Sequence, residues 1–86
     1  MSSYNKVNGT YTSEHRGLLT DLLKQEWCFD GAVMSDWFGS HSTVGCAANG
    51  LDLKMPRPAR HGGEKMLEAV EAGQVSVAAV RESARR

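Results

Sequence analysis

With 86 residues, the chain is long enough for one hydrophobic core and too short for two domains. Ten basic and ten acidic side chains give a formal net charge of zero, which provides no electrostatic basis for binding nucleic acid or an anionic membrane. No apolar run approaches the roughly 20 residues of a membrane span. The first residues also lack the apolar stretch of a signal peptide, and cytoplasmic and secreted locations both stay open.

The first third of the chain predicts a strand end, a loop and a helix. Residues 1–4 are expected to form a short strand. Gly, Asn and Thr crowd residues 5–13, which indicates a loop. Apolar side chains then recur at steps of one, three and four residues, a spacing that predicts an amphipathic helix of about three turns. These side chains are Leu18, Leu19, Leu22, Leu23 and Trp27.

The middle third predicts two buried strands with a short helix between them. After Asp30-Gly31, the run 32–34 (Ala-Val-Met) is of the buried-strand type and ends in Ser35-Asp36-Trp37. Residues 44–48 are suited to a short helix, which Asn49-Gly50 would stop. Residues 51–55 alternate as a strand does and end at Pro56.

The last third predicts two helices. A loop rich in Pro and Gly leads to a helix over 64–72 that Gly73 closes, and Ser76 can cap a final helix. Alternating buried strands and helices indicate a parallel α/β arrangement. The predicted helices cannot cover both faces of a sheet of three parallel strands. We therefore expect the α/β fold to be incomplete on its own.

The two cysteines are not arranged as metal ligands. Cys28 and Cys46 have no CxxC spacing and no His cluster nearby, so we expect no zinc site and no other cofactor. Their apolar and small neighbours favour two buried free thiols over a disulfide.

Asp36 is the first candidate for chemistry. It follows the best-defined strand, and in α/β barrels reactive groups project from the carboxyl ends of the strands. A carboxylate beside an indole suits a sugar site, because the indole face packs on the C–H face of a pyranose while the carboxylate attacks the anomeric carbon. By pattern alone, Ser-Asp at a strand end is more often a helix N-cap.

The order of motifs along the whole chain resembles glycoside hydrolase family 3, the β-glucosidase family. The block Val33-Met34-Ser35-Asp36-Trp37 is the most specific part of this resemblance. The other matching blocks are residues 1–9, 18–23, Glu26-Trp27, Phe29-Asp30-Gly31, His41-Ser42-Thr43, 50–53, Met55-Pro56 and 63–65.

The resemblance implies a retaining glycosidase that removes terminal, non-reducing β-D-glucosyl residues, with a β-glucoside or oligosaccharide as substrate. Asp36 matches the nucleophile and Trp37 the aromatic wall of the sugar subsite. Tyr4 matches a tyrosine beside the nucleophile, and Met1 falls where a subsite methionine is common. An ordinary core position for Tyr4 and a plain start codon for Met1 are the alternatives.

The resemblance also implies a fold and missing parts. Residues 1–86 would form the C-terminal segment of a (β/α)₈ TIM-type barrel, about its last three βα units. The acid/base glutamate would come from a second α/β domain. The chain departs from the family pattern at two positions. Cys28 replaces a usual glycine, and Lys54 replaces a common acidic residue. The reversed charge at Lys54 puts the fine sugar specificity in doubt.

Three rival hypotheses remain open at this point. The chain could be an inactive, truncated remnant of such an enzyme. It could also belong to a β-xylosidase or N-acetylglucosaminidase relative, because the residues that read the sugar hydroxyls are absent. A helix-turn-helix DNA-binding element over residues 64–86 is opposed by the zero net charge.

Overall fold

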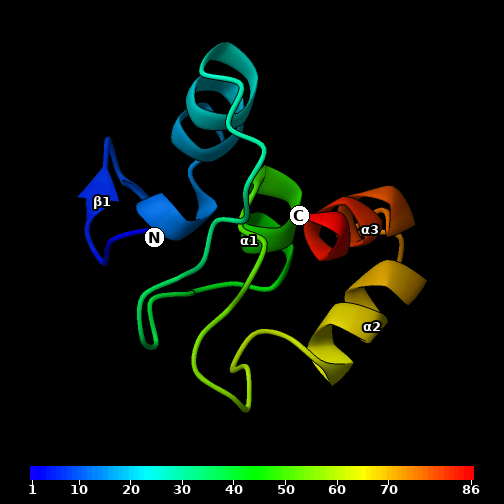
Figure 1. Ribbon diagram of the computed structural model, residues 1–86. Helices are drawn as coiled ribbons and strands as arrows, with labels where there is room; N and C mark the ends of the chain where they lie inside the picture. Colours follow the sequence, from blue (N-terminus) through cyan, green and yellow to red (C-terminus); the bar gives the residue numbers. More distant parts are fainter.

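The computed structural model describes all residues, 1–86, as an irregular α/β fold with more helix than strand (Figure 1). Two short strands come first, and five helices follow them along the chain. In chain order, the elements are β1 (Lys6–Val7), β2 (Thr10–Tyr11), the 3-10 helix η1 (Thr12–Glu14), the π-helix η2 (Gly17–Glu26), α1 (Val44–Asn49), α2 (Glu64–Glu71) and α3 (Val77–Arg85).

Three extended segments lie side by side in parallel where strands were predicted. Ser2 forms a parallel bridge with Ser35, and Met34 forms one with Leu53. The Ser2 amide donates to the Met34 carbonyl at 2.8 Å, and the Ser35 amide donates to the Leu53 carbonyl at 2.9 Å. The parallel order is therefore as expected, but each segment makes isolated bridges and none is a regular strand.

The hydrophobic core lies between η2, α1 and the two extended segments that precede Asp36 and Pro56. Its buried members are Leu19, Val33, Cys46 and Leu51, and Leu23 packs against them. The predicted apolar stripe thus reaches the core through Leu19 and Leu23.

The prediction that Trp27 belongs to the core-facing stripe is wrong. Trp27 is 65% exposed. Its amide donates to the Leu22 carbonyl, five residues back, at 2.9 Å. A helix with such i to i+5 bonds is wider than an α-helix. A period of 3.6 residues therefore assigns Trp27 to the wrong face.

The predicted loop over residues 5–13 contains an antiparallel hairpin instead. Lys6 pairs with Tyr11, and Val7 pairs with Thr10. Asn8 and Gly9 form the turn with φ of 49° and 84°. Asn-Gly is the strongest short-range hairpin signal because both residues tolerate positive φ, although it stands here in a segment whose polar composition is typical of a loop.

The helix ends follow the predicted signals. Gly50 ends α1 in the left-handed region with φ of 113°. The Ser76 hydroxyl accepts a hydrogen bond from the Ala79 amide at 3.1 Å and so caps α3. No helix in the chain combines the length and the apolar character that crossing a bilayer requires.

The prediction of two buried thiols is half right. Both cysteines are free, but only Cys46 is buried, and Cys28 is exposed. Cys28 has a φ of 54°. Glycine adopts this left-handed region without a steric penalty, which gives a physical reason for the glycine that the family resemblance places there.

Candidate functional site

Ser35 anchors the segment that carries Asp36. Its side chain is buried, and its hydroxyl accepts a hydrogen bond from the Met55 amide at 2.9 Å. One turn further on, the Phe38 amide donates to the Met55 carbonyl at 3.0 Å. The amide and the carbonyl of Met55 therefore hold the residues on either side of Asp36.

Asp36 begins a tight turn. The Gly39 amide donates to the Asp36 carbonyl at 2.9 Å, and Phe38 adopts a φ of 58°. The Asp36 carboxylate accepts a hydrogen bond from the Trp37 amide at 2.8 Å. No helix begins here, since α1 starts only at Val44, so the helix N-cap interpretation of Asp36 is wrong.

Gly39 leaves room for the turn that Asp36 begins. A Cβ at this position would lie 3.2 Å from the Asp36 carbonyl oxygen and 3.5 Å from Cδ1 of Tyr4. The first of these contacts is tighter than ordinary van der Waals contact. The absence of a side chain at Gly39 therefore avoids a close contact within the turn itself.

Tyr4 lies beside the Asp36 turn. Its hydroxyl donates to the Trp37 carbonyl at 2.8 Å. The pKa of Tyr4 is raised. Partial desolvation is the largest cause, and the hydrogen bond with Asp36 and the negative charge of Asp36 follow. All three causes favour the neutral phenol, which is the form able to donate a hydrogen bond.

The other two predicted site residues differ in how they are placed. Trp37 is 58% exposed, so much of its indole ring is open to solvent. Met1 is also exposed, and no hydrogen bond links it to the other three. The structure thus brings together Asp36, Trp37 and Tyr4, while Met1 is tied to them only through the Ser2–Ser35 bridge.

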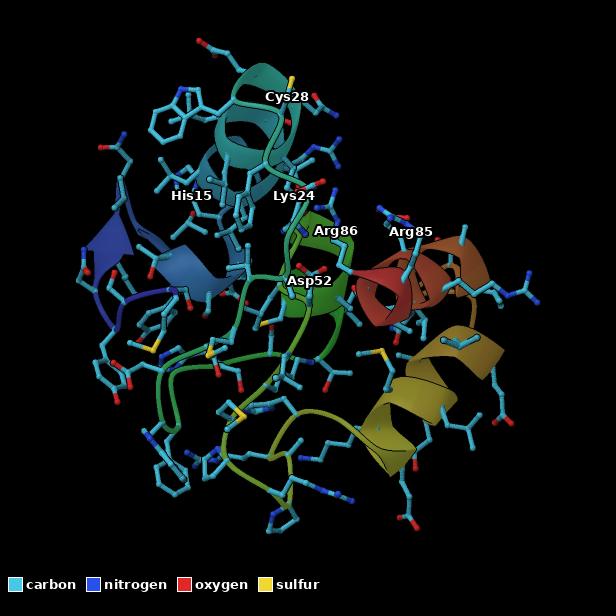
Figure 2. The ribbon with its side chains drawn as sticks, in the orientation of Figure 1. His15, Lys24, Cys28, Asp52, Arg85 and Arg86 are labelled. Carbon is cyan, nitrogen blue, oxygen red and sulfur yellow. The ribbon has the colours of Figure 1, made fainter.

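Sequence reasoning missed a buried ion pair between Lys24 and Asp52, which are both labelled in Figure 2. The Lys24 ammonium is 2.8 Å from the Asp52 carboxylate, and these side chains are 9% and 3% exposed. Lys24 also donates to the Gly50 carbonyl at 2.7 Å. The same carboxylate accepts a hydrogen bond from the Val33 amide at 2.8 Å. Asp52 therefore joins η2 to the start of the segment that leads to Asp36.

The only signal for this pair was a polar residue inside an apolar run. Asp52 interrupts Leu51-Asp52-Leu53, and Lys24 follows the apolar residues of η2. A buried charge needs a partner, but 28 residues separate the two. Only the tertiary fold identifies which lysine serves.

Lys54, one of the departures from the family pattern, points into a neighbouring loop. Its ammonium donates to the His61 carbonyl at 2.6 Å and to the Thr43 carbonyl at 3.4 Å. Burial lowers the pKa of Lys54. Lys54 therefore ties the loop after Pro56 to the segment before α1.

The site combines a carboxylate, a phenol that donates hydrogen bonds and an exposed indole. These groups suit nucleophilic attack on an acetal carbon, or stabilisation of a positive charge on it. Of the other carboxylates near the core, Glu14 is hydrogen-bonded to Ser42 and Asp52 is paired with Lys24. Neither of these two carboxylates is therefore free to protonate a leaving group.

Relatives of this chain are named as β-glucosidases. A β-glucosidase from Rhizobium radiobacter is 63% identical over 86 residues, which cover 100% of this chain and 10% of that protein. A probable β-glucosidase J from Aspergillus fumigatus is 45% identical over the same length. The chain thus spans about a tenth of these relatives.

Solved structures agree with the sequence relatives. A β-glucosidase from Kluyveromyces marxianus in complex with glucose matches 96% of this chain with a TM-score of 0.92 and 38% identity. A β-D-glucoside glucohydrolase from Trichoderma reesei matches 94% with a TM-score of 0.89. The family described as "Glycosyl hydrolase family 3 N terminal domain" matches residues 1–86. The chain belongs to glycosyl hydrolase family 3, as its motifs predicted.

Proposed function

We propose that this chain is the nucleophile-bearing part of a retaining β-glucosidase, with Asp36 as the nucleophile. The observation that carries the proposal is the position of Asp36. It follows an extended segment held on both sides by parallel neighbours, with Tyr4 and an exposed Trp37 beside it. The β-glucosidase relatives support this assignment of substrate and reaction.

The reaction would proceed by double displacement. The Asp36 carboxylate attacks the anomeric carbon and forms a covalent glycosyl ester, while an acid protonates the departing oxygen. Water, deprotonated by the same acid/base group, then hydrolyses the ester with net retention. That group has to lie about 5–5.5 Å from Asp36. We propose that it comes from a second α/β domain outside these 86 residues.

Tyr4, Trp37 and Met1 have supporting roles in this proposal. The neutral phenol of Tyr4 helps to hold the Asp36 turn, because its hydroxyl binds the Trp37 carbonyl. Trp37 offers its ring to the apolar face of the glucosyl unit. Met1 would line the same subsite from the neighbouring segment.

We further propose that residues 1–86 are the C-terminal segment of a (β/α)₈ barrel domain. The three parallel segments would be the ends of its last three strands, and η2, α1, α2 and α3 would lie outside or beside them. In such barrels the chemistry sits at the carboxyl ends of the strands, where Asp36 lies.

The test uses a grafted enzyme: the Rhizobium radiobacter β-glucosidase with its matching region replaced by these 86 residues. Incubation with a 2-fluoro-β-glucoside, followed by peptide mass spectrometry, is expected to show the label on Asp36. Asp36→Asn is expected to abolish labelling and turnover while glucose still binds. A label on any other residue would overturn the assignment.

A further inference from the structure

The segment from Lys54 to Lys65 concentrates positive charge in an otherwise neutral chain. It holds four of the ten basic side chains and one of the ten acidic ones. The basic residues are Lys54, Arg57, Arg60 and Lys65, and the acid is Glu64. The rest of the chain therefore carries a net charge of −3, while this segment carries +3.

Three of these cations have no partner in the chain. Arg57, Arg60 and Lys65 are exposed, and none of their side chains takes part in a hydrogen bond or an ion pair. Lys54 differs, because its ammonium is used by the carbonyls of His61 and Thr43. The three free side chains line one open hollow of about 600 Å³ together with one carboxylate, that of Glu64.

His61 reports the positive potential at this place. Burial comes first among the causes that lower its pKa, and the charges of Lys65, Arg60, Lys54 and His41 follow. All four charged neighbours are bases, and none of the causes opposes them. The hollow therefore holds three free cations against the one carboxylate of Glu64, and this excess of positive charge favours an anion.

The loop borders the candidate site. The Met55 carbonyl, directly before it, accepts the hydrogen bond from the Phe38 amide at 3.0 Å. The charge of His41, three residues after Phe38, also reaches His61. In Figure 1, the turn after Asp36 and the loop after Pro56 project on the same side of the molecule.

We propose that Arg57, Arg60 and Lys65 form an anion-recognition surface at the rim of the glucoside site, which selects substrates that carry a carboxylate or phosphate group. The inference rests on the proposed function, because it assigns a substrate class to that same site. The anionic group has two possible positions, the aglycone or the sugar itself. Exposed guanidinium and ammonium groups suit both carboxylates and phosphates.

The experiment compares pairs of substrates in the grafted enzyme. For the aglycone, the pair is 4-carboxyphenyl β-glucoside and its neutral counterpart, 4-carbamoylphenyl β-glucoside. For the sugar, the pair is 4-nitrophenyl β-glucoside with and without a 6-phosphate. The measured quantity is the ratio of kcat/KM, anionic over neutral, within each pair.

We expect one of the two ratios to fall about tenfold in the triple variant Arg57→Gln, Arg60→Gln, Lys65→Gln, since exposed charge pairs are individually weak. The kcat/KM of the neutral substrates is expected to stay unchanged. Arg81→Gln is the matched control, because Arg81 is an exposed cation of α3 that also lacks a partner. It is expected to change neither ratio. Raising the salt concentration from 0.05 M to about 0.5 M should reduce the original preference, by screening.

Two outcomes would overturn the inference. One is normal turnover of neutral glucosides with both ratios unaffected by the triple variant, which leaves the proposed function intact. The other is an equal fall of the ratio in the Arg81→Gln control. Failure of the proposed function looks different, because neutral glucosides would then not be hydrolysed through Asp36 at all.

A smaller graft covers the case in which the full graft does not fold. Only residues 56–65 are then placed into the Rhizobium radiobacter enzyme, whose own Asp-dependent turnover remains as the internal reference. The reference is the same short graft carrying Arg57→Gln, Arg60→Gln and Lys65→Gln, and the inference expects the anionic-to-neutral ratio of one pair to be higher with the original residues than with this reference. An unchanged ratio in both pairs would refute it.

Discussion

Lys24 and Asp52 form a buried charge pair next to the segment that leads to Asp36. Their side chains are almost inaccessible to solvent, and Asp52 also binds the Val33 amide. Removal of one partner of a buried pair leaves an uncompensated charge, which costs about 3–5 kcal/mol. Asp52 also binds the start of the segment that leads to Asp36, so removal of Lys24 leaves an unpaired charge next to that segment.

We therefore expect Lys24→Met to lower the thermal unfolding midpoint of the grafted enzyme strongly. Arg16→Met is the matched control, because the Arg16–Asp21 pair at 3.5 Å is exposed and such pairs contribute about 0–1 kcal/mol. Adding Asp52→Asn to Lys24→Met should restore part of the loss, since the amide oxygen still accepts from Val33. Equal effects of the Lys24 and Arg16 variants would show that the buried pair has no special weight.

At Trp37, a contact role and a core role predict different results. The exposed indole has little packing to lose, so Trp37→Ala should weaken glucoside binding and leave the unfolding midpoint nearly unchanged. Binding of glucose to the Asp36→Asn variant, with and without Trp37→Ala, measures this directly by calorimetry. A large fall in midpoint with unchanged affinity would assign Trp37 to the core.

Among the elements, η2 shows where a periodic pattern fails. The spacing of its leucines predicted a helix, and Leu19 and Leu23 do face the core. The wide helical turn before Trp27 then changes the phase, so that Trp27 faces solvent. Hydrophobic spacing identifies the helix, whereas the type of hydrogen bond in its last turn determines which way the Trp27 side chain faces.

The helix α3 provides a local test at the same scale. Its N-cap bond joins Ser76 to the Ala79 amide. Loss of such a cap costs about 1 kcal/mol. In the grafted enzyme, Ser76→Ala should speed amide exchange across the first turns of α3 by roughly fivefold, as measured by hydrogen–deuterium exchange mass spectrometry. Ser83→Ala, inside the same helix, should not. Equal exchange in both variants would contradict the capping role.

At the scale of the whole molecule, much of the apolar surface has no cover. Only 12 of 86 residues are buried, whereas Met34 and Leu53 lie exposed on adjacent parallel segments. A closed barrel needs about 250 residues. Segments 1–4 and 51–55 each keep one edge without a partner, and unpaired edges promote association.

We expect the isolated 86-residue chain to fold poorly as a monomer and to be inactive on β-glucosides. General acid catalysis typically contributes 10²–10⁴-fold, and in our proposal the acid/base group lies outside these 86 residues. Analytical ultracentrifugation, circular dichroism and a glucoside assay test both halves. A compact monomer that melts cooperatively would refute the folding half. Turnover that Asp36→Asn abolishes would refute the other half and reveal an acid/base residue within the chain.

The sequence by itself determined the family, the parallel order of the three segments and the ends of α1 and α3. Local signals are sufficient for these features: a specific Ser-Asp-Trp block, alternating apolar runs, Asn-Gly after α1 and Ser76 before α3. The hairpin at Asn8-Gly9 carried an equally local signal, which the polar composition of its surroundings concealed.

Only the tertiary structure decided which distant residues meet. The Lys24–Asp52 pair, the Ser35 bond to Met55 and the contact of Tyr4 with Trp37 join positions 20 to 33 residues apart. No local rule selects such partners, because hydrogen bonding and charge pairing depend on distance in space and leave no period in the sequence. The structure is likewise needed to show that Arg57, Arg60 and Lys65 have no partner, because any carboxylate or carbonyl of the chain could have paired with them.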